Sequence, residues 1–447
     1  MSEQDTIKEG SLGAPERHTL KWREESFWDE GALNAEMERV FDICHGCRRC
    51  FSLCEAFPTL FDLIDESETM EIDGVDRADF GKVVDQCYLC DMCFMSKCPY
   101  VPPHPWEVDF PKLMQRAKAV EFRKHKPPMS RRLLSSPDRM GKWATLPVVV
   151  NVVNGANRSR ALGPVREWTL GVHRDARAPQ YDPKPLRKRH RGEQPDADGA
   201  RPAGRTTGKA ALFATCYCDF NEPNIGDDLI AVFEHNGIPV TLVEGERCCG
   251  MPKMEIGDLE SVAALKDINV PKLAALVDAG WDIVAPIPSC VLMYKQELPL
   301  MFPGDEQVTK VRDHVFDPFE YLHLRHREGE LDTEFANELG DVSYHVACHL
   351  RVQNLGLRTR DVLNLVPGTK VNPVARCSGH DGTYGVRKET FEAARKLARP
   401  TVRQLESKEP KHVASDCPLA GKHLTDNMDG GRVARHPISL LRYAYGI

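Results

Sequence analysis

Apolar residues recur at intervals of three and four in parts of the first third of the chain. Residues 27–40, 77–86 and 110–122 have this spacing, which predicts amphipathic helices. The first of these helices is expected to lead into a cysteine-rich stretch, and the last is expected to follow it. Several prolines after residue 98 separate the cysteine-rich stretch from the last helix.

Prolines punctuate the chain from 126 to 208 and divide it into short pieces. Residues 140–153 and 161–172 are candidate helices, and the first combines Trp143 and a run of valines with flanking arginines and lysines. That combination is typical of a helix at a membrane interface, and equally of a helix packed across two domains. Residues 182–208 have few apolar side chains and are expected to be disordered.

Beyond residue 209, short apolar runs alternate with amphipathic stretches. Strands are expected at 210–214, 238–243 and 282–287, with helices at 225–236 and before the third strand. The same order recurs in the last part of the chain, at 342–346, 359–365, 370–374, 388–405 and 412–414. This pattern predicts an internal duplication of an α/β module with parallel strands.

These changes of pattern divide the chain into five segments. They are an N-terminal helical lead-in at 1–35, a cysteine-rich domain at 36–125, a basic proline-rich linker at 126–208, and two α/β modules at 209–330 and 331–447. The expected fold class therefore combines α-helix in the first part with α/β structure in the second.

Eight cysteines of the second segment form two runs with nearly the same spacing. The first run is Cys44-x2-Cys47-x2-Cys50-x3-Cys54, and the second is Cys87-x2-Cys90-x2-Cys93-x4-Cys98. Three thiolates at such intervals converge on one face of a turn while the fourth points elsewhere, which suits two [4Fe–4S] clusters that exchange ligands between the runs. We therefore assign Cys44, Cys47, Cys50 and Cys98 to one cluster, and Cys87, Cys90, Cys93 and Cys54 to the other.

Zinc is the alternative metal for these runs, because four cysteine thiolates commonly hold it. Zinc sites, however, usually combine two separated Cys-x2-Cys pairs. Each run here has three cysteines at successive gaps of two residues. The spacing therefore favours iron–sulfur clusters.

A cysteine follows each of the three expected strands in both α/β modules. The first module has Cys216, the adjacent Cys248 and Cys249, and Cys290, with Cys218 as a fifth candidate; the second has Cys348, Cys377 and Cys417. Because the carboxyl ends of parallel strands meet at one edge of a sheet, we expect each set to gather there as metal ligands. Cys248 and Cys249 are also candidates for a catalytic thiol pair.

Composition describes an ordinary soluble protein, with 41% hydrophobic and 28% charged residues and 16 cysteines among 447 residues. The first residues lack the basic and apolar segments of a secretory signal, and the apolar run at 146–153 is too short to cross a bilayer. Clustered cysteines in a reducing compartment are typical of metal ligands rather than disulfides. We therefore expect a protein of the cytoplasm or of the inner membrane face.

The net charge of −7 conceals an uneven distribution. Residues 112–209 contain 23 Lys and Arg against 8 Asp and Glu, a balance of +15, so the remainder carries −22. One interpretation is a solvated linker. The other is attraction to anionic lipid or to an acidic partner, and hence peripheral membrane contact.

The cysteine positions of the two modules resemble those of a known family. Cys248-Cys249-Gly250 with Cys216 and Cys290, repeated as Cys348, Cys377-Ser378-Gly379 and Cys417, resembles the CCG cysteine-rich domain of heterodisulfide reductase. Cys348-His349-Leu350-Arg351 and Gly382-Thr383-Tyr384-Gly385 match as well. The whole layout is similar to the CCG-domain iron–sulfur oxidoreductases, which include iron–sulfur subunits of anaerobic glycerol-3-phosphate dehydrogenase and glycolate oxidase.

The resemblance implies an all-helical ferredoxin domain with two [4Fe–4S] clusters, followed by two tandem CCG modules. It also implies a relay of single electrons between a flavoprotein dehydrogenase or other redox protein and a quinone or protein acceptor, with rubrerythrin-like proteins as a further candidate partner. An additional iron–sulfur cluster or zinc is the candidate cofactor of the CCG modules.

Departures from the family pattern lie in the modules. Ser378 replaces the second cysteine of the second motif, and Met293 and Ala420 occupy positions where heterodisulfide reductase has further cysteines. The second module therefore has three candidate thiol ligands, and His349 or Asp416 is a candidate for a fourth ligand.

Two other functions compete with the relay. One is a heterodisulfide reductase-like thiol–disulfide reductase that uses Cys248 and Cys249. The other is a zinc-bearing nucleic-acid binder with 112–209 as a basic arm. The overall acidity and the absence of helix-turn-helix or RNP-like motifs disfavour the latter, so no nucleic-acid partner is expected. Since no glycine-rich nucleotide motif occurs, a flavin would belong to a partner.

Overall fold

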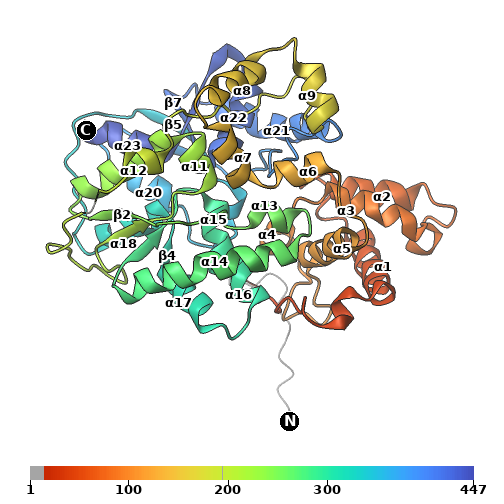
Figure 1. The fold of residues 1–447 in the computed structure, drawn as a ribbon. Coiled ribbons are helices and arrows are strands. Elements are labelled where there is room, and N and C mark those ends of the chain that lie inside the picture. The colour runs from red at the N-terminus through yellow and green to blue at the C-terminus, as the bar shows by residue number, and fades with distance from the viewer. Residues whose placement is uncertain (1–14, 194) are drawn as a thin grey trace. The chain divides into compact units, whose positions relative to one another are not determined.

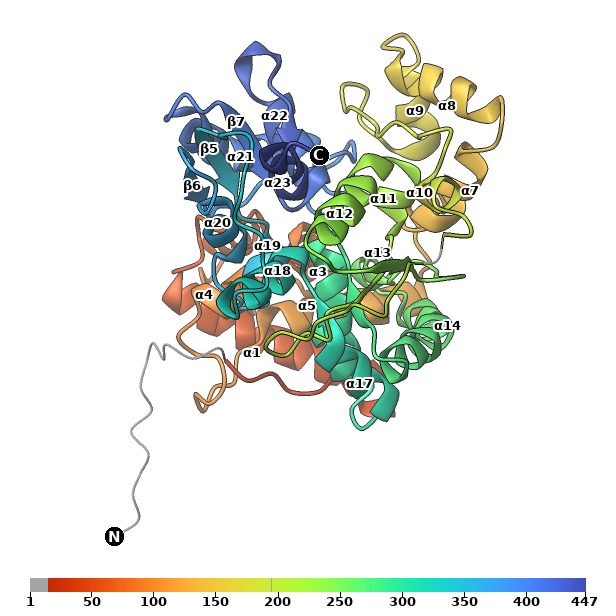
Figure 2. The same cartoon turned by 90° about the vertical axis from the view of Figure 1, so that its left-hand side faces the viewer.

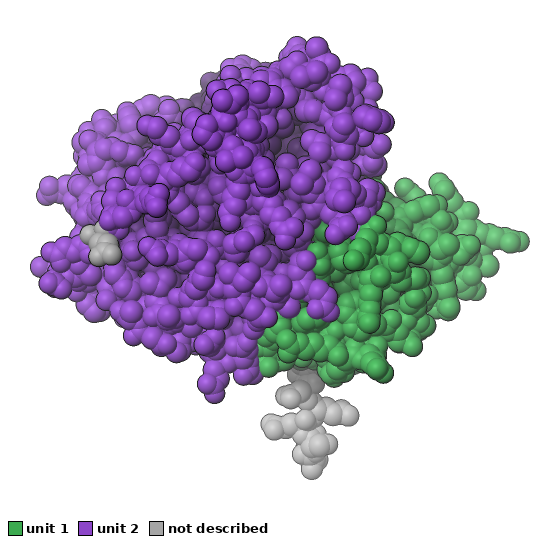
Figure 3. Space-filling view, in the orientation of Figure 1, with its two compact units in different colours: residues 1–126, 254–259, 300–303 green, residues 127–253, 260–299, 304–447 purple. Residues whose placement is uncertain are grey.

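The computed structural model describes residues 15–193 and 195–447, and its chain divides into two compact units (Figure 3). Unit 1 comprises Met1–Lys126 together with Met254–Leu259 and Leu300–Pro303, and unit 2 comprises the rest of the chain. The first part of the expected lead-in, residues 1–14, lies outside the described residues. Among the helices of the described residues, none has the length and apolar character needed to cross a membrane.

Unit 1 is helical throughout its described residues, as the N-terminal pattern predicted (Figure 1). Its elements are η1 (Glu25–Trp28), α1 (Glu30–Cys47), α2 (Ala56–Asp65), η2 (Ile72–Gly74), η3 (Arg77–Asp79), α3 (Phe80–Gln86), α4 (Met92–Ser96) and α5 (Phe110–Lys124). An aromatic core joins the longer helices. The ring of Phe41 on α1 lies 5.1 Å from that of Phe80 on α3, and Phe57 on α2 lies 4.7 Å from Phe110 on α5. These packed rings fix the end of α1, where the first cysteines stand.

Unit 2 contains two parallel four-stranded sheets with the same strand order, β2-β1-β3-β4 and β6-β5-β7-β8. In the first sheet Ala210 pairs with Val240 on one side and Asp282 on the other. In the second sheet Val342 occupies the corresponding central position, between Val371 and His412. Identical order with parallel pairing confirms the predicted duplication of an α/β module.

The first module runs through β1 (Ala210–Leu212), α11 (Cys216–Phe220), α12 (Pro223–His235), β2 (Val240–Leu242), α13 (Met251–Glu255), α14 (Leu259–Asp278), β3 (Asp282–Val284), α15 (Pro288–Leu292), η4 (Met293–Glu297), α16 (Leu298–Met301), α17 (Glu306–His314), β4 (Val315–Phe316) and α18 (Pro318–Arg327). The second runs through β5 (Asp341–His345), α19 (Cys348–Arg351), α20 (Arg358–Leu363), β6 (Lys370–Val374), α21 (Phe391–Glu406), β7 (His412–Ser415), α22 (Pro418–Asp426), η5 (Asp429–Gly431), β8 (Ala434–Arg435) and α23 (Pro437–Tyr445).

One hydrophobic core serves both modules. Leu212 and Val284 from the first sheet and Val342 and Tyr344 from the second are fully buried in the same cluster. Helix α12 of the first module packs along α23 of the second, and α15 packs against α19. The carboxyl ends of β3 and β5, from which α15 and α19 begin, are thereby brought close together (Figure 2).

Three features of the middle and C-terminal regions differ from the sequence-based expectation. The fourth strands, β4 and β8, were not predicted, because two residues are too few to show an alternating pattern. The expected helix at 140–153 is two helices, α7 (Pro137–Ala144) and α8 (Val149–Arg158). Proline cannot continue a helix, and Pro147 falls between the two.

Residues 182–193 and 195–208 pack onto the first module, although disorder was expected there. The short helix α10 (Leu186–Arg189) places Leu186, which is fully buried, in the common core. Its side chain lies directly over Gly226 of α12, where a Cβ would come within 2.2 Å of Leu186 Cδ2. A single apolar side chain that fits such a hollow is invisible to an average over composition.

We predict that Leu186→Ala lowers the free energy of unfolding by about 3 kcal/mol, because it leaves a cavity in the core. Leu162→Ala is the matched control, since the Leu162 side chain is exposed and its loss should change the free energy by less than about 0.5 kcal/mol. Anaerobic urea unfolding followed by tryptophan fluorescence would measure both. Equal midpoints for the two variants would contradict the packing of this segment.

Candidate functional site

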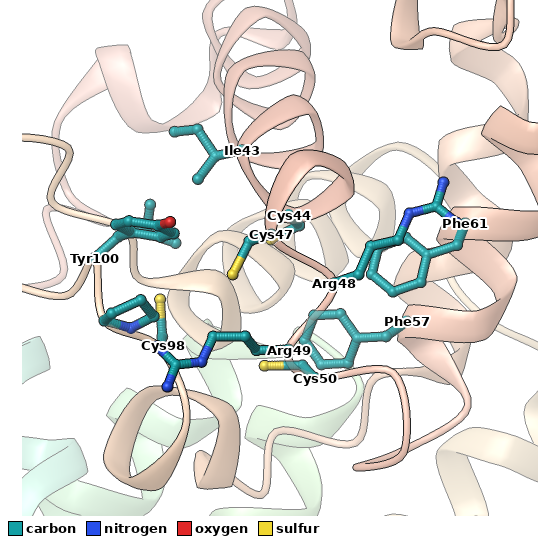
Figure 4. A pocket seen from close by; sticks show the side chains of 12 residues that line it. Ile43, Cys44, Cys47, Arg48, Arg49, Cys50, Phe57, Phe61, Cys98 and Tyr100 are labelled. Atoms are coloured by element: carbon teal, nitrogen blue, oxygen red, sulfur yellow. The ribbon is translucent and has the colours of Figure 1, made fainter. Parts of the chain in front are cut away.

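Four cysteines of unit 1 surround one pocket. Cys44 and Cys47 occupy the last turn of α1, and Arg48 then takes a left-handed conformation (φ 50°), which turns the chain so that Cys50 comes to the same pocket. Cys98, which follows α4, closes the group. The pocket encloses about 310 Å³ of space not filled by atoms, part of it open to solvent, and Phe57 and Tyr100 are among its walls (Figure 4). This is the set that the sequence assigned to one cluster.

The thiols around this pocket resist ionisation. Burial, followed by the charges of Cys98, Cys50 and Cys47, raises the pKa of Cys44 well above its usual value. Burial is also the main cause that raises the pKa of Cys50 to about 12. Four thiolates here would repel one another, so the set becomes stable in its charged form only beside a bound cationic group.

The second group in unit 1 contains Cys54, Cys87 and Cys93, all buried, and the half-buried Cys90. Burial raises the pKa of Cys93 well above normal, and the charges of Cys87, Cys54 and then Cys50 raise it further. Cys93 is therefore close to Cys54 and Cys87, as the crosswise pattern predicts. Its interaction with Cys50 shows that the two groups adjoin.

Arg17 is a residue of this region that the sequence analysis missed. Its guanidinium donates to Asp91 (2.5 and 3.1 Å) and to Asp109 (3.0 and 3.1 Å), and its side chain is almost fully buried. Asp91 interacts with Cys93, and Asp109 interacts with Cys98. Arg17 therefore balances two carboxylates that lie beside the cysteine groups. No local pattern marks it, since its partners lie 74 and 92 residues away.

Four cysteines of the first module are joined in a row by hydrogen bonds between their sulfur atoms. Cys216, at the start of α11, bonds to Cys248, Cys248 bonds to Cys249, and Cys249 bonds to Cys290 on α15. The three strands thus deliver their cysteines to one place at the carboxyl edge of the sheet. Cys218 is fully buried in the apolar core and interacts with Cys216 and Cys290 through charge only.

These hydrogen bonds and burial set the pKa values of the row. The bond with Cys216 lowers the pKa of Cys248, but the bond with Cys249 and burial outweigh it, so the pKa is raised well above normal. For Cys249 the bond with Cys248 lowers the pKa, and the bond with Cys290 and burial raise it further. As free thiols, both cysteines are therefore protonated and unreactive at neutral pH.

A cation from the basic segment also reaches this row. Arg187 donates to both carboxylate oxygens of Asp219, from its backbone nitrogen (3.0 Å) and its guanidinium (2.5 Å), and forms an ion pair with Glu246. Glu246 also accepts from the backbone nitrogen of Thr215 (3.2 Å), and Arg187 interacts with the charge of Cys216. The sequence analysis missed Arg187 because it placed 182–208 outside any folded unit.

The second module places Cys348, Cys377 and Cys417 directly after β5, β6 and β7. Of the two candidate fourth ligands, Asp416 is engaged, because its carboxylate accepts from Thr359 Oγ1 (2.9 Å) and from the Tyr344 hydroxyl. His349 contacts Ser289 of the first module through Nδ1 (2.8 Å), and its buried Nε2 has no hydrogen-bond partner among the described residues. His349 therefore retains a free ligand atom, and Asp416 does not.

Two further histidines of the second module escaped the sequence analysis. His380 and His423 are buried with ring centroids 5.7 Å apart, and both nitrogens of His380 lack a partner among the described residues. Burial lowers the pKa of His380 to about 3 and that of His423 to about 4, so both imidazoles are neutral. The duplication could have drawn attention to His380, because Cys377-Ser378-Gly379-His380 aligns with Cys248-Cys249-Gly250-Met251.

The chemistry of the donor sets fits iron–sulfur clusters. Such clusters take cysteine thiolates at several irons, so their ligands surround a volume rather than a point. The pocket lined by Cys44, Cys47, Cys50 and Cys98 has this form. Within the described ranges, no three His, Cys, Asp or Glu side chains gather closely enough to hold a single metal ion.

Comparison with known proteins identifies the two modules. The family model of the CCG cysteine-rich domain matches residues 210–295 and 342–424. The chain carries two CCG domains. These matches contain all eight cysteines of unit 2, so the α/β modules of the structure are CCG modules.

Similar curated proteins are components of oxidoreductases or proteins of substrate utilisation. The chain is 27% identical over 347 residues to the C-type component of the anaerobic glycerol-3-phosphate dehydrogenase of Escherichia coli K12, covering 76% of this chain and 83% of the relative. It is 27% identical to a component of the fumarate reductase (CoM/CoB) of Methanothermobacter marburgensis (49% of this chain, 42% of the relative). It is 29% identical to lactate utilization protein A of Bacillus cereus strain G9842 (40% and 75%). These relationships support an oxidoreductase-associated role.

We predict that Cys98→Ser and Cys54→Ser each remove a different cluster from unit 1. Each variant should lose about four irons per chain, because one ligand of each [4Fe–4S] set is gone. EPR spectra of the dithionite-reduced proteins should show two different uncoupled signals where the unaltered protein shows a coupled one. Identical residual spectra from the two variants would contradict the crosswise assignment.

Proposed function

We propose that this CCG-domain protein relays single electrons between a dehydrogenase or other redox protein and a quinone or protein acceptor. In this proposal Cys44, Cys47, Cys50 and Cys98 hold one [4Fe–4S] cluster, and Cys87, Cys90, Cys93 and Cys54 hold a second. The row of Cys216, Cys248, Cys249 and Cys290, with Cys218 beside it, holds a further iron–sulfur cluster. The single observation that carries the proposal is the grouping of four cysteine thiols around one pocket.

When bound, such clusters supply sites that gain and lose one electron. The chain's own contribution is the environment of the sulfur atoms. Backbone N–H groups of Tyr100, Gly250 and Met251 donate to Cys98, Cys248 and Cys249, respectively. Hydrogen bonds to ligand sulfur and exclusion of water are the means by which a protein sets a cluster's potential. Unit 1 and the first CCG module therefore both have the surroundings that a redox centre needs.

The second CCG module differs from the first in what it offers. Cys348, Cys377 and Cys417 give three thiols, and burial raises the pKa of Cys417 to about 11. His349 supports a fourth ligand for a cluster or for zinc, since its Nε2 is buried without a partner among the described residues. We infer that this module holds a different cofactor from the first, or a more weakly bound one.

The relatives indicate the class of partner. One is named as part of a glycerol-3-phosphate dehydrogenase and another as part of a fumarate reductase, so a flavoprotein dehydrogenase or reductase is the electron donor or acceptor that we favour. A peroxide-reducing protein of the rubrerythrin type is a second partner class. We place the protein in the cytoplasm, where the 16 cysteines, all free of disulfides here, would stay reduced.

Iron and acid-labile sulfide, measured on protein purified without oxygen, would test the relay. We expect about twelve or more irons per chain, because at least three clusters are proposed. About eight irons, with coupled cubane signals in EPR, would remove the CCG modules from the relay. Zinc in place of iron at the cysteines of unit 1 would overturn the proposed function.

A thiol–disulfide reductase is the second candidate, and the contact between the adjacent Cys248 and Cys249 favours it. Cleavage of a disulfide to two thiols takes up two electrons and two protons, which the relay would deliver. If this hypothesis is correct, Cys249→Ser should abolish disulfide reduction and leave the unit 1 clusters intact. Ser378→Ala, at the equivalent position of the second module, is the matched control. Unchanged turnover in Cys249→Ser would exclude this function.

A further inference from the structure

Helices α6 (Met129–Leu134), α7, α8 and α9 (Gly163–Leu170) of unit 2 share an exposed apolar surface, which we call the 129–168 face. Ten of the 17 large exposed hydrophobic side chains among the described residues belong to it. They are Met129, Leu133, Trp143, Leu146, Val148, Val149, Val152, Leu162, Val165 and Trp168. The helices pack on one another, α6 against α7 and α9 and α7 against α8, and the views of Figures 1 and 2 both place α7, α8 and α9 side by side.

Helix α8 is arranged with its polar side inward. The side chain of Asn154 is buried and makes two hydrogen bonds of 2.8 Å with the backbone of Tyr181, and Asn157 donates to the carbonyl of Pro179 (3.0 Å). Val148, at the N-terminus of the helix, and Val152 face solvent instead. A helix that packs on a protein core ordinarily shows the reverse arrangement.

The neighbouring helices repeat this inversion. Arg166 of α9 is buried and donates to the carbonyls of Ala156 and Asn157 (2.9 Å each), while Trp168 on the same helix is 86% exposed. On α7, Asp138 is buried in an ion pair with Arg247 (3.0 Å), while Trp143 is 72% exposed. Three successive helices therefore bury their polar groups and expose their largest apolar ones.

The turn between α7 and α8 carries the inversion furthest. Leu146, Val148 and Val149 are all exposed there, and Val148 has a φ of 69°. The left-handed region is strained for a β-branched side chain, so a valine at this position is costly for the fold. The strain is borne by a side chain that contributes no packing to the described structure.

The charges around the 129–168 face are of one sign. Arg132, Arg139, Lys142, Arg158 and Arg160 are exposed, and none of them forms an ion pair with a described residue. The two acidic residues of this stretch, Asp138 and Glu167, are neutralised by Arg247 and Arg174. An apolar surface with tryptophans at its edges, surrounded by unpaired cations, is complementary to anionic lipid headgroups above a hydrocarbon layer.

We propose that the 129–168 face docks the protein onto the surface of an anionic lipid bilayer. Trp143, Val148 and Trp168 enter the interfacial zone, and the five exposed cations contact lipid phosphates. A protein partner would have to satisfy five unpaired cations around an apolar protrusion, whereas an anionic bilayer provides both complements everywhere on its surface. This inference rests on the surface alone and does not depend on the proposed electron relay.

Sedimentation with lipid vesicles tests the proposal on the full-length holoprotein. We expect binding to vesicles of phosphatidylcholine mixed with phosphatidylglycerol, and much weaker binding to phosphatidylcholine alone. Raising the salt to about 1 M should weaken binding, because the Debye length falls to about 3 Å. Equal sedimentation with both vesicle types, or none with either, would overturn the proposal.

Two valines provide a matched pair of variants, because Val148 and Val433 are 74% and 73% exposed and only the first lies in the 129–168 face. Val148→Asp should reduce the partition coefficient about tenfold, since it places an anion in the lipid-facing turn, and Val433→Asp should leave it unchanged. The same response from both variants would mean that net charge alone governs binding, and would overturn the proposal. Thermal unfolding of both variants would check that each remains folded.

Quenching by brominated lipid locates the contact independently of affinity. Trp143→Phe with Trp168→Phe keeps the face apolar, so this double variant should still bind anionic vesicles but lose most of the tryptophan quenching. Quenching that persists would place the contact elsewhere and overturn the assignment. If Trp143→Ser with Trp168→Ser leaves vesicle binding intact and releases a co-purifying protein instead, the face is a protein interface.

Discussion

The burial of ionisable thiols is the constraint on which the rest of this structure depends. Burial and mutual repulsion raise the pKa of Cys44 and Cys93 in unit 1, and a hydrogen bond to Cys248 with burial does the same for Cys216 in unit 2. Backbone N–H groups and the cations Arg17 and Arg187 favour the charged forms, but they do not outweigh these effects. Sites of this kind are completed by a bound cationic group, which couples ligand loading to the stability of the fold.

Duplication explains how the thiols come together and also how the two modules diverged. Identical strand order in both sheets brings three strand ends to one edge in each module. The first module fills that edge with cysteines, whereas the second has Ser378 and His380 where the first has Cys249 and Met251. An orphaned imidazole in a dry site is unfavourable unless something contacts it. The second module has thus replaced thiol donors by imidazole donors without losing the fold.

The sequence predicted most of what is periodic or repeated, and little of what depends on distant partners. Spacing alone grouped Cys98 with Cys44, Cys47 and Cys50, and the structure lines one pocket with these four. Arg17 and Arg187 could not be found in this way, because the residues they neutralise lie 32 to 92 positions away. The disorder expected for 182–208 followed from its low apolar content, and the fit of Leu186 over Gly226 overrides that average.

The basic proline-rich segment at 126–208 shows why composition misleads. Its inner surface meets backbone carbonyls and buried carboxylates, so asparagine and arginine are the side chains that hold it in place. The exposed apolar residues of its helices are consequently not needed for folding. A serine at 168 or a glycine at 148 would leave the described contacts intact, and glycine would relieve the strained backbone. Tryptophan and valine at these positions therefore answer a requirement that lies outside the fold of the isolated chain.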